Sequence, residues 1–219
     1  MNLRERPLYA IYPGPADGPA DVEAVMQAFC RAGAGIIQYR EKRLRDGECL
    51  AVARRAVAAA RPWNVPVVMN DRADLARLSQ AHGVHLGQED LPVEAAKGLL
   101  GPGSVVGVSV DTASEADAAA EAGADYVSLG PAYPTTTKRD VPSPRSLDLY
   151  RQLAQRLDVP LVAIGGIDEE NLAPLVDAGV AAVAVISALY RDGEVEARAR
   201  ALVEAVRRAR TSDQEQDRT

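Results

Sequence analysis

The sequence predicts an α/β fold, a single-domain (β/α)8 TIM barrel, and three observations lead to it. Short runs rich in β-branched residues alternate with alanine-rich segments that have helical spacing. Three helical segments end in an Ala-Gly pair, where glycine permits the left-handed turn that returns the chain to a sheet. A doubly wound sheet more often carries a glycine-rich dinucleotide motif after its first strand, and none follows Tyr12.

The expected strands begin roughly 25 residues apart, a spacing that suits βα units. In chain order they are Pro7–Tyr12, Gly35–Tyr39, Pro66–Met69, Gly83–Leu86, Ser104–Val110, Tyr126–Leu129, Pro160–Ile164 and Ala182–Ile186. The clearest helical segments are Asp21–Ala32, Asp46–Ala60, Ser114–Ala122, Asp168–Ala178 and Glu194–Arg210. Eight right-handed βα units close naturally into a barrel. Residues 1–209 are therefore expected to form the barrel domain, and the polar residues 210–219 a disordered tail.

Composition narrows the classes of function. The 219 residues are 47% apolar and 26% charged, which is typical of a globular chain with a sizeable core. The net charge of −6 disfavours a nucleic-acid partner, so an anionic substrate would need a local basic pocket. The sequence shows neither a signal peptide nor a long apolar run, and Cys30 and Cys49 fit neither a metal knuckle nor a redox pair. We expect a cytoplasmic chain with no membrane contact and with two reduced cysteines. The sequence leaves open whether the chain forms a homo-oligomer.

In a barrel of this kind, functional side chains gather where strands end. After the second strand, alternation places Gln38, Arg40 and Lys42 on one face and Tyr39 and Glu41 on the other. If the first set points into the barrel mouth, two cations and an amide converge and call for an anionic ligand. A solvated strand end with Glu41 as the partner of the cations is the alternative.

The third and fourth strands end in acidic residues. Asp71 follows the third strand and Asp90 the fourth, and carboxylates at neighbouring strand ends suit Mg²⁺ completed by phosphate oxygens. The alternative is that these residues cap the following helices. His82 and His85 point to opposite faces of a strand, so we expect His85 to be a hydrogen-bonded barrel residue rather than a zinc ligand.

The remaining strand ends suit phosphate. Ser109 ends the fifth strand, and a loop after the sixth carries three hydroxyls and an ammonium group between Thr135 and Lys138. That loop is long enough to act as a lid, or it is a Thr-rich surface loop. Gly165-Gly166 and Ile186-Ser187 follow the last two strands, where barrels often bind phosphate. Two such places imply one bisphosphate or two phosphorylated substrates.

The ordered motifs together resemble thiamine-phosphate synthase over about Leu8 to Leu189. The motifs are QYREK at 38–42, ND at 70–71, GVHLGQED at 83–90, GVS at 107–109, GPAYPTTTK at 130–138, AIGGI at 163–167 and IS at 186–187. The resemblance implies that a hydroxymethylpyrimidine diphosphate and a thiazole phosphate, plain or carboxylated, are joined to thiamine phosphate with Mg²⁺ and release of pyrophosphate. It also implies a dissociative reaction in which the pyrimidine carries a positive charge.

Carried over residue by residue, the resemblance assigns metal ligands, catalytic residues and substrate contacts. It places Mg²⁺ on Asp71 and Asp90, and catalysis on Arg40, Lys42, Ser109 and Lys138. The substrate contacts that it implies are Gln38, Tyr39, Arg40, Glu41, Lys42, Asn70, Ser109, Thr135, Thr136, Thr137, Lys138, Gly166, Ile186 and Ser187.

Three departures from the family pattern stand out. Asp111 replaces a histidine of many relatives, Ser146 replaces a common glycine, and Tyr12-Pro13 ends the first strand. An acid at Asp111 would help near a developing cation but would repel pyrophosphate. Two other functions are weighed against the synthase: a thiazole tautomerase of the same barrel family, and a non-enzymatic phosphate-ligand sensor. Both are disfavoured because every diphosphate and metal residue is present.

Overall fold

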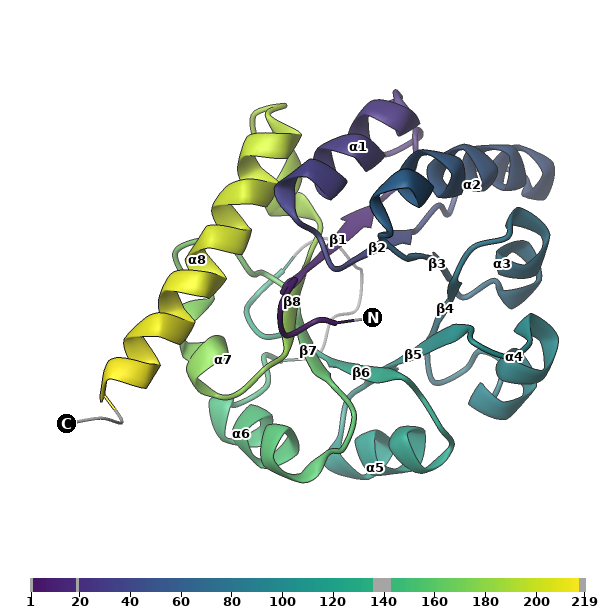
Figure 1. Cartoon of the computed structure of the whole chain (residues 1–219). Coiled ribbons are helices and arrows are strands. Elements are labelled where there is room, and N and C mark those ends of the chain that lie inside the picture. Colours follow the sequence, from purple (N-terminus) through teal and green to yellow (C-terminus); the bar gives the residue numbers. More distant parts are fainter. Residues whose placement is uncertain (1, 19, 136–142, 217–219) are drawn as a thin grey trace.

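The computed structural model describes residues 2–18, 20–135 and 143–216, and it confirms the predicted barrel. Eight parallel strands close in chain order, so that β1 pairs with both β2 and β8 (Figure 1). They are β1 (Leu8–Tyr12), β2 (Ile36–Tyr39), β3 (Val67–Asn70), β4 (Gly83–Leu86), β5 (Val105–Val110), β6 (Tyr126–Leu129), β7 (Leu161–Ile164) and β8 (Ala182–Val185). Each lies within one residue of its predicted bounds at either end.

Helices surround this ring of strands (Figure 1). They are α1 (Val22–Ala32), α2 (Asp46–Ala60), α3 (Ala73–Ser79), α4 (Val93–Leu100), α5 (Ala113–Glu121), α6 (Leu147–Arg156), α7 (Ala173–Asp177) and α8 (Val195–Gln216), with short 3₁₀ turns η1 (Arg61–Trp63) and η2 (Ser187–Tyr190). The predicted left-handed turns are present, with φ of 93° at Gly33, 87° at Gly123 and 92° at Gly179. Within the described ranges, no helix has the length and apolar character needed to span a bilayer.

The strands are buried on both faces, and alternation divides their side chains between two cores. On β1, Leu8, Ala10 and Tyr12 join the large core between strands and helices, whereas Tyr9 and Ile11 join a smaller core inside the barrel. This division carries on to the strand ends. It therefore decides which polar residues face the barrel mouth.

Helix α7 is shorter than the predicted Asp168–Ala178 and begins at Ala173. Pro174 occupies its first turn, and the preceding residues form a hydrogen-bonded loop instead. The Asn171 side chain accepts from the backbone N–H of Asp168 at 3.0 Å and donates to the carbonyl of Gly166 at 2.8 Å. Such side-chain bonds compete with helix formation.

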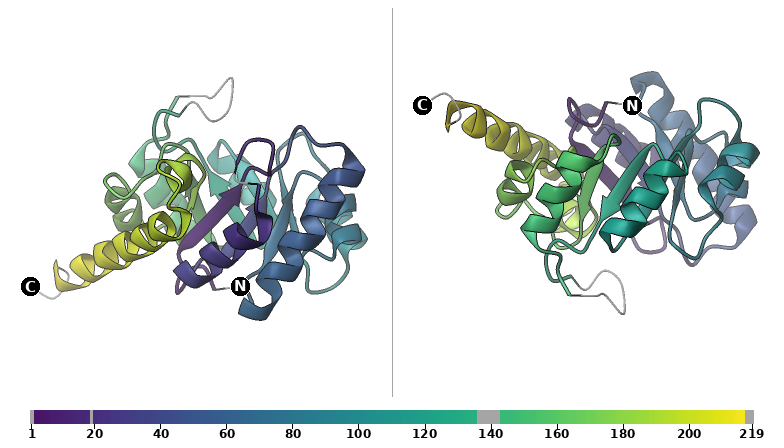
Figure 2. Two further views of the ribbon diagram at one scale, coloured as in Figure 1. Left: turned by 90° about the horizontal axis from the view of Figure 1, so that it is seen from above. Right: turned by 90° about the horizontal axis from the view of Figure 1, so that it is seen from below.

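Helix α8 runs past its predicted end at Arg210 and is helical to Gln216. The Arg210 guanidinium donates to the carbonyls of Arg4 and Ala181, which fixes the helix against the barrel at this point. Adding residues to a helix that is already nucleated is favourable for Arg, Gln and Glu. The last turns extend away from the barrel (Figure 2). Residues 217–219 lie outside the described residues.

Candidate active site

A cavity of about 600 Å³ opens at the carboxyl ends of the strands, and we call it the mouth pocket. Most of the predicted site residues line it, and they come from the ends of different strands and from the loops that follow them. They are Gln38, Arg40, Lys42, Asn70, Asp71, Asp90, Ser109, Thr135, Gly166, Ile186 and Ser187. Thr136, Thr137 and Lys138 lie outside the described residues.

One wall of the mouth pocket combines cations and carboxylates. Lys42 Nζ lies 3.4 Å from Asp71 Oδ2, and Arg40 lines the same wall. Partial burial raises the pKa of the Asp90 carboxyl, and the neighbouring Asp71 carboxylate raises it further, against a lowering hydrogen bond from the Gly87 N–H. Two carboxylates therefore face each other with only a partial counter-charge from Lys42.

Neither acid caps a helix. Helix α3 has Arg72 as its N-cap and α4 has Pro92, and neither cap uses a side-chain bond. Asp90 instead accepts from the Gly87 N–H at 2.6 Å, which closes the loop after β4. The helix-capping interpretation is therefore wrong for both residues.

The carboxylate pair fits a divalent cation. Mg²⁺ takes oxygen ligands and often uses one or two carboxylates together with phosphate oxygens and water. Among the described residues, no group of three or more His, Cys, Asp or Glu side chains is placed to hold a metal. A cation between Asp71 and Asp90 would therefore need further ligands from a substrate or from water.

The floor of the mouth pocket is a chain of buried polar side chains. Gln38 donates to the Tyr9 hydroxyl at 2.7 Å, and the hydroxyls of Tyr9 and Tyr126 lie 2.8 Å apart. His85 bonds Tyr126 through Nδ1 and Ser109 through Nε2, both at 2.9 Å. The prediction that His85 is a hydrogen-bonded barrel residue is confirmed. Burial lowers its pKa to about 4, so the imidazole is neutral at physiological pH.

Sequence patterns did not single out Tyr9 or Tyr126. The signal for them is Gly107 on β5, where an added Cβ would collide with Cζ of Tyr126, its paired residue on the neighbouring strand β6. Glycine at this inward-facing position makes room for the tyrosine ring.

The opposite wall is formed by backbone rather than by charged side chains. Gly165 and Gly166 have φ of 100° and 65°, and a Cβ on Gly166 would lie 2.6 Å from the carbonyl oxygen of Pro134. These positions require glycine because the loop after β7 packs tightly against the loop after β6. Ile186 and Ser187 complete this wall after β8. A glycine backbone and a hydroxyl after the last two strands are the groups with which barrels of this kind often bind phosphate.

Two residues that the resemblance implies as substrate contacts, Tyr39 and Glu41, do not line the mouth pocket. Tyr39 lies in the outer core, its ring stacked on Tyr12 at 5.8 Å. One oxygen of Glu41 accepts from the backbone N–H groups of Lys42 and Arg43 at 2.8 and 2.7 Å. Both sit on the face of β2 opposite to Gln38 and Arg40, as the alternation requires. Glu41 thus shapes the loop that carries Lys42, and it is not an ion-pair partner for the cations in the mouth.

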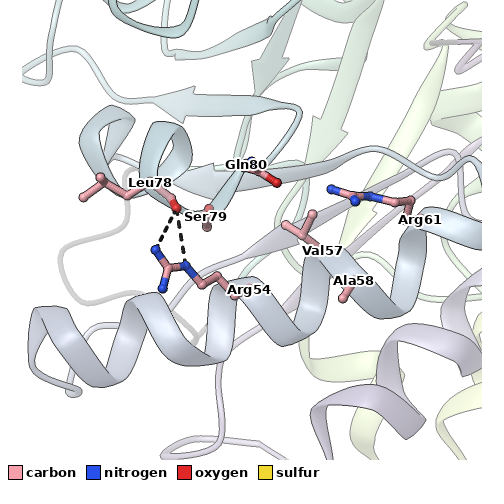
Figure 3. Close-up of a pocket in the computed structure, with 7 residues that line it drawn as sticks. All are labelled: Arg54, Val57, Ala58, Arg61, Leu78, Ser79 and Gln80. Carbon is pink, nitrogen blue, oxygen red and sulfur yellow. Dashed lines mark hydrogen bonds between the residues drawn. The ribbon is translucent and has the colours of Figure 1, made fainter.

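A second cavity, of about 360 Å³, lies outside the barrel between α2 and α3 (Figure 3). Arg54 crosses it to donate to the carbonyl of Leu78, and Arg61 lies at its far end (Figure 3). None of the predicted site residues lines it. The mouth pocket is therefore the candidate active site.

Comparisons with known proteins agree with this geometry. The family model described as thiamine monophosphate synthase matches residues 8–189. The chain is 37% identical to the thiamine-phosphate synthase of Clostridium novyi over 85% of this chain and 91% of that protein. It is 47% identical to a thiamine biosynthesis bifunctional protein of Symbiobacterium thermophilum over 93% of this chain, but it spans only 41% of that longer protein.

Among solved structures, the thiamine phosphate pyrophosphorylase of Pyrococcus furiosus superposes with a TM-score of 0.81 at 32% identity. The match covers 94% of this chain and 98% of the other. The family model, the sequence relatives and the solved structure all indicate the same family. The chain therefore belongs to the thiamine monophosphate synthase family of transferases.

Proposed function

We propose that the mouth pocket joins a pyrimidine methyl diphosphate to a thiazole phosphate and releases thiamine phosphate and pyrophosphate. The observation that carries this proposal is the pairing of two unlike walls in one cavity. The wall with Arg40, Lys42 and two carboxylates suits a diphosphate with its metal. The wall with Gly166 and Ser187 suits a single phosphate.

On the diphosphate side, we assign Arg40 and Lys42 to the phosphate oxygens because their charges favour them. Gln38, Asn70 and Ser109 would hold the pyrimidine end, because amide and hydroxyl groups match its ring nitrogens and amino group. On the other side, Gly166, Ile186 and Ser187 would take the thiazole phosphate. Thr135 also lines the mouth pocket, and we assign it, with the neighbouring Thr136, Thr137 and Lys138 of the motif, to the pyrophosphate and the thiazole phosphate.

Asp71 and Asp90 would hold Mg²⁺, because they provide hard oxygen ligands beside the diphosphate wall. When bound there, the cation would neutralise negative charge that grows on the departing pyrophosphate.

The chemistry that we propose breaks the C–O bond between the pyrimidine methylene and the diphosphate, and the electron pair leaves with pyrophosphate. The aminopyrimidine carries the resulting positive charge. The lone pair of the thiazole nitrogen then forms the new C–N bond, and no proton has to be removed. The chain's residues therefore contribute orientation and charge, and a general base is not needed.

The experiment is to incubate the purified protein with both substrates and measure thiamine phosphate by fluorescence after oxidation. We expect product with the wild type and at least tenfold less with Asp71→Asn or Asp90→Asn, together with a higher Mg²⁺ requirement. Asp148→Asn, on the exposed start of α6, should behave as the wild type. Isomerised thiazole phosphate without thiamine phosphate would support a tautomerase and reject the proposal.

We also propose a cytoplasmic location. It is supported by two buried free thiols, Cys30 and Cys49, which a reducing compartment preserves.

A further inference from the structure

Beneath the mouth pocket, five side chains from five strands form one continuous hydrogen-bonded chain. It runs in the order Gln38, Tyr9, Tyr126, His85, Ser109. Gln38, Tyr9, Tyr126 and His85 are each at most 6% exposed, so water does not compete for their bonds. The two end members line the cavity.

The direction of the hydrogens in this chain follows from its first bond. The Gln38 amide nitrogen donates to the Tyr9 oxygen, so the Tyr9 hydrogen is free to go to Tyr126. Tyr126 then accepts from Tyr9 and must direct its own hydrogen to His85 Nδ1. An Nδ1 that accepts leaves the single imidazole hydrogen on Nε2. His85 Nε2–H consequently donates to Ser109 Oγ.

We infer that Tyr9, Tyr126 and His85 act as positioning residues that lock His85 as the Nε2–H tautomer and turn Ser109 into a hydrogen-bond donor toward the pocket. Among the described residues, Ser109 Oγ has His85 as its protein partner, so its own hydrogen is left for a ligand. This inference deepens the proposed function and rests on it for the ligand, because the ring nitrogens and diphosphate oxygens of the pyrimidine substrate are acceptors. A reversed chain would use up the Ser109 hydrogen on His85.

The tautomer can be read directly in the ligand-free protein. The chain has two histidines, so labelling with imidazole-¹⁵N histidine gives two sets of signals, and His82→Gln assigns them. Long-range ¹H–¹⁵N correlation spectra separate the two neutral tautomers. We expect His85 to show the Nε2–H pattern at neutral pH. An Nδ1–H pattern, or a doubly protonated ring, overturns the inference.

A matched pair of variants tests the consequence for activity. Tyr126→Phe removes the donor to His85 Nδ1, and Tyr150→Phe removes another buried hydroxyl, which donates to the Leu129 carbonyl at 2.9 Å outside the mouth pocket. We expect Tyr126→Phe to populate the Nδ1–H tautomer and to lower kcat/KM about tenfold. Tyr150→Phe should keep the Nε2–H pattern and change kcat/KM less than about twofold.

If Tyr126→Phe and Tyr150→Phe both fold and show the same tautomer spectrum and the same kcat/KM, the inference is overturned. That result would mean that the Tyr126 hydroxyl has only a structural role. Tyr9→Phe adds a second readout. It should keep the His85 tautomer, since Tyr126 still donates to Nδ1, but it removes the bond that anchors Gln38. If the wild type makes no thiamine phosphate, the proposed function fails, and the spectrum of the ligand-free protein still decides the direction of the chain.

Discussion

The Arg145 guanidinium donates a hydrogen bond of 2.7 Å to the Asp111 carboxylate at the rim of the mouth pocket. The same side chain donates to the carbonyl of Gly130 at 3.1 Å, and the Arg145 backbone N–H donates to the carbonyl of Pro131 at 2.8 Å. Arg145, two residues before α6, thus joins the ends of β5 and β6. Asp111, which departs from the family pattern, presents a paired rather than a free charge to the substrates.

Removing the ion pair between Arg145 and Asp111 should weaken binding of the pyrimidine diphosphate. Arg145→Met keeps much of the side-chain volume but leaves the Asp111 carboxylate unpaired, so repulsion should raise KM for the pyrimidine diphosphate roughly fivefold. The double variant Arg145→Met/Asp111→Asn should recover most of the loss. Steady-state kinetics of the single and double variants measure the coupling. A double variant as impaired as Arg145→Met would show that the charge on Asp111 does not matter.

The two walls of the mouth pocket should bind different substrates. Arg40→Ala is expected to weaken binding of the pyrimidine diphosphate at least tenfold, because it removes a charged donor to phosphate. Ser187→Asp should instead weaken the thiazole phosphate by placing like charges together. Calorimetric titration of each ligand measures both effects, with Arg54→Ala in the outer cavity as a control that changes neither. The reverse assignment of the losses would refute the proposed division.

Gly107 should be required for the stability of the barrel floor. Gly107→Ala forces a methyl group into the Tyr126 ring and is expected to lower the free energy of unfolding by about 3 kcal/mol. Gly98 is the matched control, because it is exposed in α4 and an added Cβ meets nothing within 4 Å. Gly98→Ala should stabilise by about 0.5–1 kcal/mol. Urea unfolding of both variants provides the comparison, and equal stabilities would contradict the close packing at Gly107.

His85 should make the protein less stable in mild acid. Burial lowers its pKa to about 4, and the Asp90 carboxylate opposes this shift only in part. The unfolded chain takes up a proton near pH 6.5 that the native state refuses until about pH 4. Protonation of His85 therefore costs no stability above pH 6.5. As the pH falls to 4, it lowers the free energy of unfolding by about 3 kcal/mol. Urea unfolding at several pH values between 4 and 6.5 measures how the free energy of unfolding depends on pH. This dependence should be weaker for His85→Gln than for the wild type, and an equal dependence would argue against a neutral buried imidazole.

The features that the sequence predicts well depend on local patterns. Strand bounds follow from short β-branched runs, and the split of Gln38 and Arg40 from Tyr39 follows from alternation alone. The resemblance implies that all five residues of the QYREK motif are substrate contacts, whereas only Gln38, Arg40 and Lys42 of them line the mouth pocket. A motif read as a continuous stretch ignores the alternation that divides it between two cores.

The features that the sequence misses depend on distant partners. The hydroxyls of Tyr9 and Tyr126 meet across 117 positions of the chain, and no periodicity reports such a pair. Asn171 was assigned to a helix, yet its amide supports the backbone of the Gly166 loop. Helix α8 extends past its predicted end at Arg210, because a polar composition without apolar periodicity does not distinguish the end of a helix from a tail.

The most direct test of the central claim is to measure thiamine phosphate and pyrophosphate in the same reaction, with both substrates and Mg²⁺ present. We predict that the wild-type protein forms the two products in equal amounts and that excess EDTA abolishes both. Pyrophosphate release without thiamine phosphate, or full activity in excess EDTA, would contradict the assignment of the mouth pocket as a metal-assisted synthase site.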